Sequence, residues 1–303
     1  MGSGGAGVGG AWPAPPTPRS PSPFDMGSLT RSSERPLHRI ALVTQGPRTP
    51  GRRARSARAH ATFPAMPVDI LAIAAHRDDV ELTCAGTLLR ARDAGYRTAI
   101  LDLTAGEMGT RGSAELRARE AAEAAKVLGV QERRNAGLPD AHLQNDDAAR
   151  RVLVEHIRHF APRVVILPFS IGRHPDHRIA SEVGRDACYL AGLARYPAPG
   201  TPHRPVKILY ALAYREDPVK PTFVVDISAQ FERKLNAIRC YSSQFDGVKG
   251  AGEIFPTGQD LYSLVETQNA HYGSLIRRRY GEPFFTYETM VVDDVVKLEG
   301  QSM

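Results

Sequence analysis

The feature that most constrains the fold is a short, almost uninterrupted apolar run at residues 68–75 (VDILAIAA), followed by four polar residues. Such a run is typical of a β-strand buried on both faces, as in parallel sheets covered by helices on both sides. After it the apolar residues change to helical spacing, with Val80, Cys84, Leu88 and Ala91 three or four positions apart. The sequence therefore predicts a strand followed by a helix, the beginning of a βαβ unit.

The same alternation continues along the chain and predicts the following further segments: strands at 98–103 and 163–168, helices at about 113–128, 146–160 and from 175, strand-like segments at 207–213 and 222–227, and helices near 229–241 and 259–278. Strands alternating with helices at this spacing favour a right-handed, doubly wound sheet. We predict one α/β domain over residues 66–303, with a Rossmann-like, mostly parallel sheet.

Residues 1–65 have a different composition. They hold 10 of the 23 prolines and 9 of the 27 glycines, with nine Arg, no Lys and two acidic residues. Too few apolar residues are present to offset the loss of chain entropy on folding, so we interpret this segment as a disordered extension. Translation starting at Met66 is the alternative, and the prolines disfavour an amphipathic transit peptide.

Charge, hydropathy and cysteine content exclude several classes. The chain carries a net charge of +6, but residues 1–65 account for +7, so the remainder is nearly neutral and gives no reason to expect nucleic-acid binding. No apolar run approaches the roughly 18–20 residues that cross a bilayer, so we expect no membrane span. The three cysteines form no close pair, which argues against a disulfide framework and favours the cytoplasm.

Two clusters of His and Asp directly follow predicted strands. His76, Asp78 and Asp79 come after the first strand, and His174 and His177 come after a later one. Alone, either cluster is more often a solvated pair or a helix cap than a metal site. Because ligands collect at the carboxyl ends of parallel strands, two such clusters favour one shared site.

The ligand types indicate the metal. Two imidazoles and one carboxylate with an open fourth position are typical of catalytic zinc, which makes water a nucleophile at neutral pH. Neighbouring aspartates at a helix start point in different directions. One can therefore bind the metal while the other accepts the proton of the attacking water.

Eight short motifs occur in a fixed order: 75–81 (AHRDDVE), 86–87 (GT), 102–104 (DLT), 115–117 (ELR), Asn135 with 138–140 (LPD), 174–177 (HPDH), 226–228 (DIS) and 241–245 (YSSQF). In these motifs the chain resembles the LmbE-like (PIG-L type) zinc deacetylases, from about residue 68 to 285. It is most similar to the bacillithiol-biosynthesis deacetylases, which remove acetate from N-acetylglucosaminyl malate.

The resemblance implies a role for each matching residue. His76, Asp79 and His177 would bind one Zn²⁺. Asp78 would be the general base, and His174 would be the charged partner that stabilises the oxyanion or protonates the leaving amine. The implied partner is a small N-acetylated amino sugar, and we expect a homo-oligomer.

The resemblance also points to two substrate-binding arginines and shows two departures. Arg117 would lie near the substrate, and Arg204 would meet a polar group such as a malate carboxylate. Arg77 stands where the family usually has Pro or Ala. Tyr262 is offset by one position from a tyrosine of the family.

We therefore expect hydrolysis of the acetamide of an N-acetylglucosaminyl conjugate. The first alternative is another N-acyl sugar as substrate, such as an inositol conjugate or a chitin fragment. The second is a metal-free, Rossmann-like nucleotide-binding protein. It would leave both His/Asp clusters unexplained, because the glycines at 106, 109 and 112 do not have dinucleotide-binding spacing and favour a loop over the pocket.

Overall fold

The computed structural model describes residues 66–212, 219–246, 260–297 and 299, so the predicted disordered extension at 1–65 lies outside the described residues. The strands are β1 (Ile70–Ala74), β2 (Thr98–Thr104), β3 (Glu132–Leu138), β4 (Val164–Pro168), β5 (Lys207–Ala211), β6 (Phe223–Asp226) and β7 (Gly281–Phe285). The helices are α1 (Asp79–Thr83), α2 (Ala85–Asp93), α3 (Ala114–Leu128), α4 (Asp147–Phe160), α5 (Pro175–Ala191), α6 (Phe231–Arg239), α7 (Ser242–Phe245) and α8 (Leu261–Leu275), with a 3-10 turn η2 (Val295–Lys297).

The strands of the described residues form one seven-stranded sheet in the order β3-β2-β1-β4-β5-β7-β6. The first five strands in this order are parallel, whereas β7 runs antiparallel to both of its neighbours. The order reverses at the centre, because β2 and β4 pair on opposite sides of β1. This confirms the predicted doubly wound, mostly parallel α/β fold.

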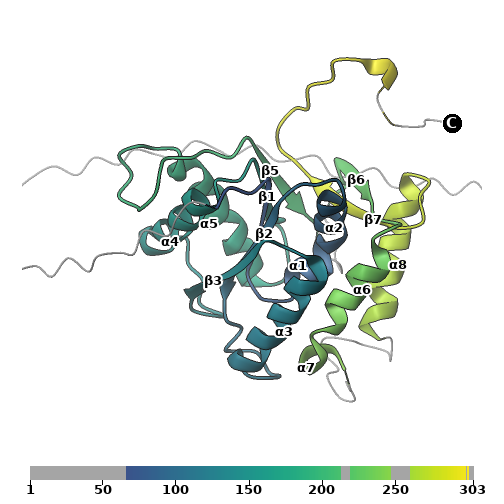
Figure 1. The fold of residues 1–303 in the computed structure, drawn as a ribbon, viewed down its shortest axis with the longest axis horizontal. Coiled ribbons are helices and arrows are strands. Elements are labelled where there is room, and N and C mark those ends of the chain that lie inside the picture. Colours follow the sequence, from purple (N-terminus) through teal and green to yellow (C-terminus); the bar gives the residue numbers. More distant parts are fainter. Residues whose placement is uncertain (1–65, 213–218, 247–259, 298, 300–303) are drawn as a thin grey trace, which may run out of the picture. The chain divides into compact units, whose positions relative to one another are not determined.

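Helices cover both faces of the sheet (Figure 1). Leu71 and Ile73 of β1 pack in the core beneath α4 and α5, and Ala72 and Ala74 pack in a second core beneath α2 and α6. Both faces of β1 are therefore dry. This is why its sequence is apolar at nearly every position instead of alternating.

The structure differs from the sequence prediction at three elements. The single helix expected after Asp79 is broken at Cys84 into α1 and α2. Strands β3 and β7 were not predicted, because β3 is an edge strand with a polar sequence (ERRNAGL) and β7 contains Pro283. Cys84 itself is buried, as its place on the apolar stripe predicts.

A buried carboxylate explains the break between α1 and α2. Glu282 of β7 accepts hydrogen bonds from the backbone N–H groups of Gly86 (2.8 Å) and Thr87 (2.7 Å), in the first turn of α2. Lys234 of α6 donates to the same carboxylate at 2.7 Å, and both side chains are fully buried. Glu282 thus caps one helix and joins it to a second, where the helix dipole favours negative charge.

We predict that Lys234→Met lowers the free energy of unfolding by about 3–5 kcal/mol, because it leaves Glu282 as a buried carboxylate without its cation. Lys126→Met is the matched control, since its pair with Glu123 is exposed (71% and 61%) and exposed pairs contribute about 0–1 kcal/mol. Urea denaturation measures both. Equal losses in the two variants would contradict a stabilising role for the buried pair.

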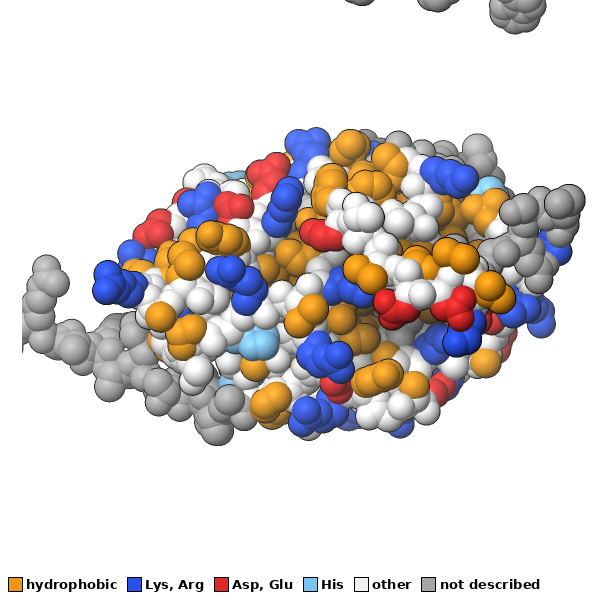
Figure 2. All heavy atoms as spheres, turned by 90° about the horizontal axis from the view of Figure 1, so that it is seen from above, with side chains coloured by type: hydrophobic (Ala, Val, Ile, Leu, Met, Phe, Trp, Pro, Cys, Tyr) orange, Lys and Arg blue, Asp and Glu red, His pale blue; other side chains and the backbone are white. Residues whose placement is uncertain are grey.

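The helices and one face of the molecule can be compared with the classes excluded from the sequence. No described helix combines the length and the hydropathy that a bilayer span needs. On the face shown in Figure 2, Lys and Arg side chains are interspersed with Asp and Glu around hydrophobic groups.

Candidate metal centre

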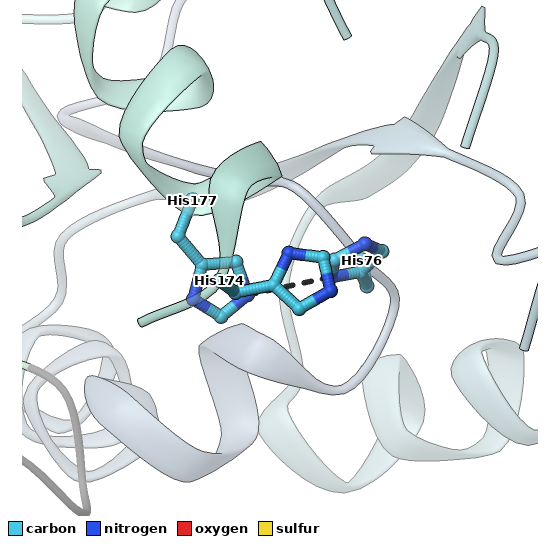
Figure 3. A group of neighbouring side chains, drawn as sticks. All are labelled: His76, His174 and His177. Atoms are coloured by element: carbon cyan, nitrogen blue, oxygen red, sulfur yellow. Dashed lines mark hydrogen bonds between the residues drawn. The ribbon is translucent and has the colours of Figure 1, made fainter. Parts of the chain in front are cut away.

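The candidate site lies at the carboxyl ends of β1 and β4, which are neighbours in the sheet. His76 follows β1 by two residues, and His174 and His177 lie at the start of α5, which follows β4. Pro175 occupies the first turn of α5, where its fixed φ suits a helix start. The three imidazoles face one another in Figure 3, with His76 Nδ1 3.3 Å from His177 Nε2.

The carboxylate of Asp79 lies between these two rings. One of its oxygens is 3.3 Å from His76 Nδ1, and the other is 3.1 Å from His177 Nε2. Zinc bonds nitrogen and oxygen at about 2.0–2.2 Å in tetrahedral geometry, which places neighbouring ligand atoms about 3.3–3.6 Å apart. The two 3.3 Å separations from His76 Nδ1 meet the lower end of this range, whereas the 3.1 Å contact of His177 Nε2 is made with the other oxygen of Asp79. The three side chains thus lie about as close together as the ligands of a single ion.

The opposite edge of the His76 ring faces two further carboxylates. Its Nε2 is 3.1 Å from Asp140 Oδ1 and 3.5 Å from Asp176 Oδ2. Backbone N–H groups fix both acids: Ala141 donates to each, and Met108 donates to Asp140 at 2.9 Å. A proton on Nε2 satisfies these acceptors and leaves the Nδ1 lone pair free for a metal, the usual arrangement around metal-bound histidines.

Asp140 and Asp176 are not among the site residues predicted from the sequence. Asp140 follows the carboxyl end of β3, the same position relative to its strand that singled out His76. Because β3 was not recognised as a strand, this clue was lost.

Negative charge dominates this region. Burial lowers the pKa of His76, but Asp79, Asp140 and Asp176 outweigh burial and raise it to about 12. Burial raises the pKa of Asp79, yet His177 and His76 hold it well below its usual range. The proton on the His76 imidazole balances the negative charge of the surrounding carboxylates. A divalent cation bound there would balance this charge instead.

Asp78 points away from Asp79 and toward α3. Its Oδ1 is 3.2 Å from Arg117 Nη2, and burial raises the pKa of Asp78 while Arg117 opposes the shift. Arg117 is itself buried and donates to the carbonyl of Gly106 at 3.3 Å. Gly106 has a φ of +72°, and a Cβ on it would lie 2.1 Å from Arg117 Nη1. The predicted base and its arginine therefore lie together at the cavity.

His174 is oriented by the backbone of its own helix. Its Nδ1 accepts the N–H of Asp176 at 3.2 Å, so in the neutral ring the proton is on Nε2. Burial and the neighbouring His76 and His177 lower the pKa of His174.

Three other residues singled out from the sequence lie away from these rings. Arg204 donates to the carbonyl of Tyr189 and stacks over its ring. Tyr189 lies in the last turn of α5, roughly 18 Å along the helix from His177 at about 1.5 Å per residue. Tyr262 donates to Asp246 at 3.0 Å. The Arg77 side chain turns from the metal site to the carbonyls of Ala105 and Ala114.

A cavity of about 430 Å³ opens above the three imidazoles. The glycine-rich loop after β2 forms part of its wall through Met108, Thr110 and Arg111, as its position after the strand predicted. Ile171 and Arg173 line the cavity from the segment between β4 and α5. The space above the rings suits a small, partly polar molecule.

Solved structures with the same fold belong to related proteins. The conserved protein TT1542 of Thermus thermophilus is 37% identical, with a TM-score of 0.67 over 75% of this chain and 98% of that one. N,N'-diacetylchitobiose deacetylase of Pyrococcus horikoshii is 27% identical, with a TM-score of 0.61 over 71% and 82%. Relatives in sequence and structure are deacetylases, and these comparisons place the chain among the hydrolases that act on amides.

Sequence comparison identifies the family. The model of the PIG-L family (GlcNAc-PI de-N-acetylase) matches residues 71–188. Diacetylchitobiose deacetylase of Thermococcus kodakarensis is 30% identical over 232 residues, which cover 70% of this chain and 80% of that protein. The chain belongs to the PIG-L family of de-N-acetylases. The family prediction is confirmed, and the nucleotide-binding alternative loses its support.

We predict that His177→Ala weakens zinc binding by more than the 10- to 100-fold expected for Asp140→Asn, which removes only an outer partner of His76. His203→Ala is the control, because its Nε2 contacts the carbonyl of Pro162 outside the cavity. Competition with a chromogenic chelator measures each affinity. Unchanged zinc affinity in His177→Ala would rule out this residue as a ligand.

Proposed function

We propose that this protein hydrolyses the acetamide of an N-acetylglucosaminyl conjugate, with one Zn²⁺ held by His76, Asp79 and His177. The observation that carries the proposal is the set of 3.1–3.3 Å separations between these side chains. The cavity above them supports it, and so does membership of a de-N-acetylase family. Zinc, when bound, polarises a carbonyl and makes water acidic enough to attack it.

Asp78 suits the role of general base. It is adjacent to the proposed ligand Asp79 in sequence, but its carboxylate faces Arg117 and the cavity. Water adds to the acetamide carbon and transfers a proton to Asp78. Arg117 holds this carboxylate in place through a charge-assisted hydrogen bond.

His174 suits a second role, donation of a hydrogen bond to the oxygen that becomes negative. Its Nε2–H is available because Nδ1 is occupied by the N–H of Asp176. This N–H can donate to the oxygen that becomes negative when water adds. As the C–N bond breaks, the amine takes the proton that Asp78 received, and the products are acetate and the free amino sugar.

The side chains of the cavity wall indicate which kind of substrate the site would accept. Arg111 and Arg173 line it beyond the metal ligands, beside the apolar Ile171 and Phe245. Guanidinium groups favour an anionic aglycone, which supports N-acetylglucosaminyl malate and a place in bacillithiol biosynthesis. Similarity to two diacetylchitobiose deacetylases supports the alternative, a chitin fragment.

We predict that Asp78→Asn retains zinc but loses about 100- to 10,000-fold in kcat, the usual contribution of a general base. Asp69→Asn is the control, since Asp69 bonds to the backbone of Arg97 and does not line the cavity. Acetate release and elemental analysis of the same samples give the two readouts. An active Asp78→Asn enzyme would refute the base assignment.

The substrate assignment is tested by acetate release from N-acetylglucosaminyl malate, N-acetylglucosaminyl inositol and diacetylchitobiose, each with and without a chelator. We expect the malate conjugate to have the highest kcat/KM and all activity to stop when zinc is removed. The Arg111→Met variant separates the candidates further. It should raise KM for the malate conjugate and leave KM for diacetylchitobiose nearly unchanged.

A further inference from the structure

A buried ion cluster lies beside the segment that carries His76 to Asp79. Arg133 of β3 forms a two-pronged ion pair with Asp102 of β2, with both N–O distances 2.8 Å. Its third nitrogen donates to Glu81 of α1 at 2.6 Å. Asp102 is 2% exposed and Glu81 is fully buried. None of these residues lines the cavity.

The cluster ends on one backbone atom of the metal-site segment. Arg133 Nη2 and the hydroxyl of Tyr241 both donate to the carbonyl oxygen of Arg77. The Tyr241 hydroxyl is also 3.2 Å from Glu81 Oε1, and the Tyr241 ring is fully buried. Donors from β3 and from the start of α7 thus meet on the peptide that joins Arg77 to Asp78.

This peptide lies where regular structure gives no support. β1 ends at Ala74 and α1 begins at Asp79, so neither the sheet ladder nor helical hydrogen bonds fix the Arg77 carbonyl. Rotation of this peptide would move Asp78 on one side and His76 on the other. Reacting and ligating groups must be held to within about 0.5 Å, and misplacement by about 1 Å can cost 100-fold in rate.

We propose that Arg133 and Tyr241 are positioning residues, which hold the Arg77 carbonyl and thereby set the relative placement of His76, Asp78 and Asp79. Buried ion clusters add little net stability compared with apolar packing, so stability alone gives a weak reason for this one. The inference rests on the proposed function, since it concerns the geometry of the same zinc site.

Tyr241→Phe tests the proposal, because it removes only the hydroxyl. Tyr280→Phe is the matched control: Tyr280 is also a buried residue whose hydroxyl bonds a carboxylate, that of Glu266 in α8 at 2.6 Å, and it does not line the cavity. For each variant we would measure the zinc Kd by chelator competition, kcat and KM for acetate release, and urea stability of the metal-free protein.

We expect Tyr241→Phe to raise the zinc Kd about tenfold and lower kcat roughly 10- to 100-fold, with KM changed less than about twofold. Tyr280→Phe should lose stability only. If Tyr241→Phe loses stability but matches wild type in Kd and kcat, the residue is structural and the proposal is wrong.

Arg133→Lys gives a second test, which keeps the charge but cannot reach Asp102, Glu81 and the Arg77 carbonyl together. Arg158→Lys is its control, because Arg158 is a buried arginine of α4 that donates to the carbonyls of Ala191 and Leu193. Arg133→Lys should weaken zinc binding and lower kcat, and Arg158→Lys should do neither. Equal zinc affinity and kcat in the two variants would overturn the role of Arg133.

The controls separate this inference from the proposed function. A wild-type protein that neither binds zinc nor releases acetate would overturn the proposed function and this inference with it. A wild-type protein that does both, with Tyr241→Phe and Arg133→Lys equal to their controls, would overturn the positioning role alone.

Discussion

The site depends on the pairing of β1 with β4 at the centre of the sheet. Ile70 lies opposite Val164 and Ala72 opposite Ile166, so the two parallel strands end at the same edge. The segments that follow them can then bring His76 and His177, 101 positions apart in the sequence, to 3.3 Å from each other. This register is secured by apolar contacts on both faces of β1, directly beneath the polar groups of the site. The packing of β1 and β4 in the core thus determines how close the two imidazoles lie.

The edge of the sheet that carries the site holds an excess of carboxylates. Three carboxylates surround His76, and backbone N–H groups of Ala141 and Met108 hold two of them in place. A proton on His76 balances their negative charge, and a bound cation would balance it instead. Because a bound cation stabilises only the folded arrangement, metal affinity and folding stability are coupled in a site of this kind. The preference of the site for positive charge therefore affects the stability of the fold as well as the binding of a metal.

Sequence patterns predicted the features that depend on burial and on the order of strands and helices. They failed where polar side chains, paired inside the fold, interrupt the apolar pattern that marks a strand. The apolar run of β1 and the two His/Asp clusters indicated both the sheet and the meeting point. β3 was missed because the charge of Arg133 is neutralised by Asp102 inside the fold, a pairing that no local pattern shows. Asp140 was missed with its strand. Arg204 was expected near the substrate from the resemblance, but its guanidinium contacts Tyr189, close to the end of α5.

Gly106 and Arg117 share one small volume beside Asp78. The carbonyl of the glycine accepts the guanidinium, and the left-handed backbone at position 106 leaves the guanidinium the space that a Cβ would otherwise fill. Alanine at this position would have to shift the end of the Arg117 side chain and to adopt a left-handed backbone, which L side chains rarely take. A shorter residue at 117 would take the cation away from Asp78. A change at either position therefore alters the surroundings of the other, which couples the two positions in the evolution of this chain.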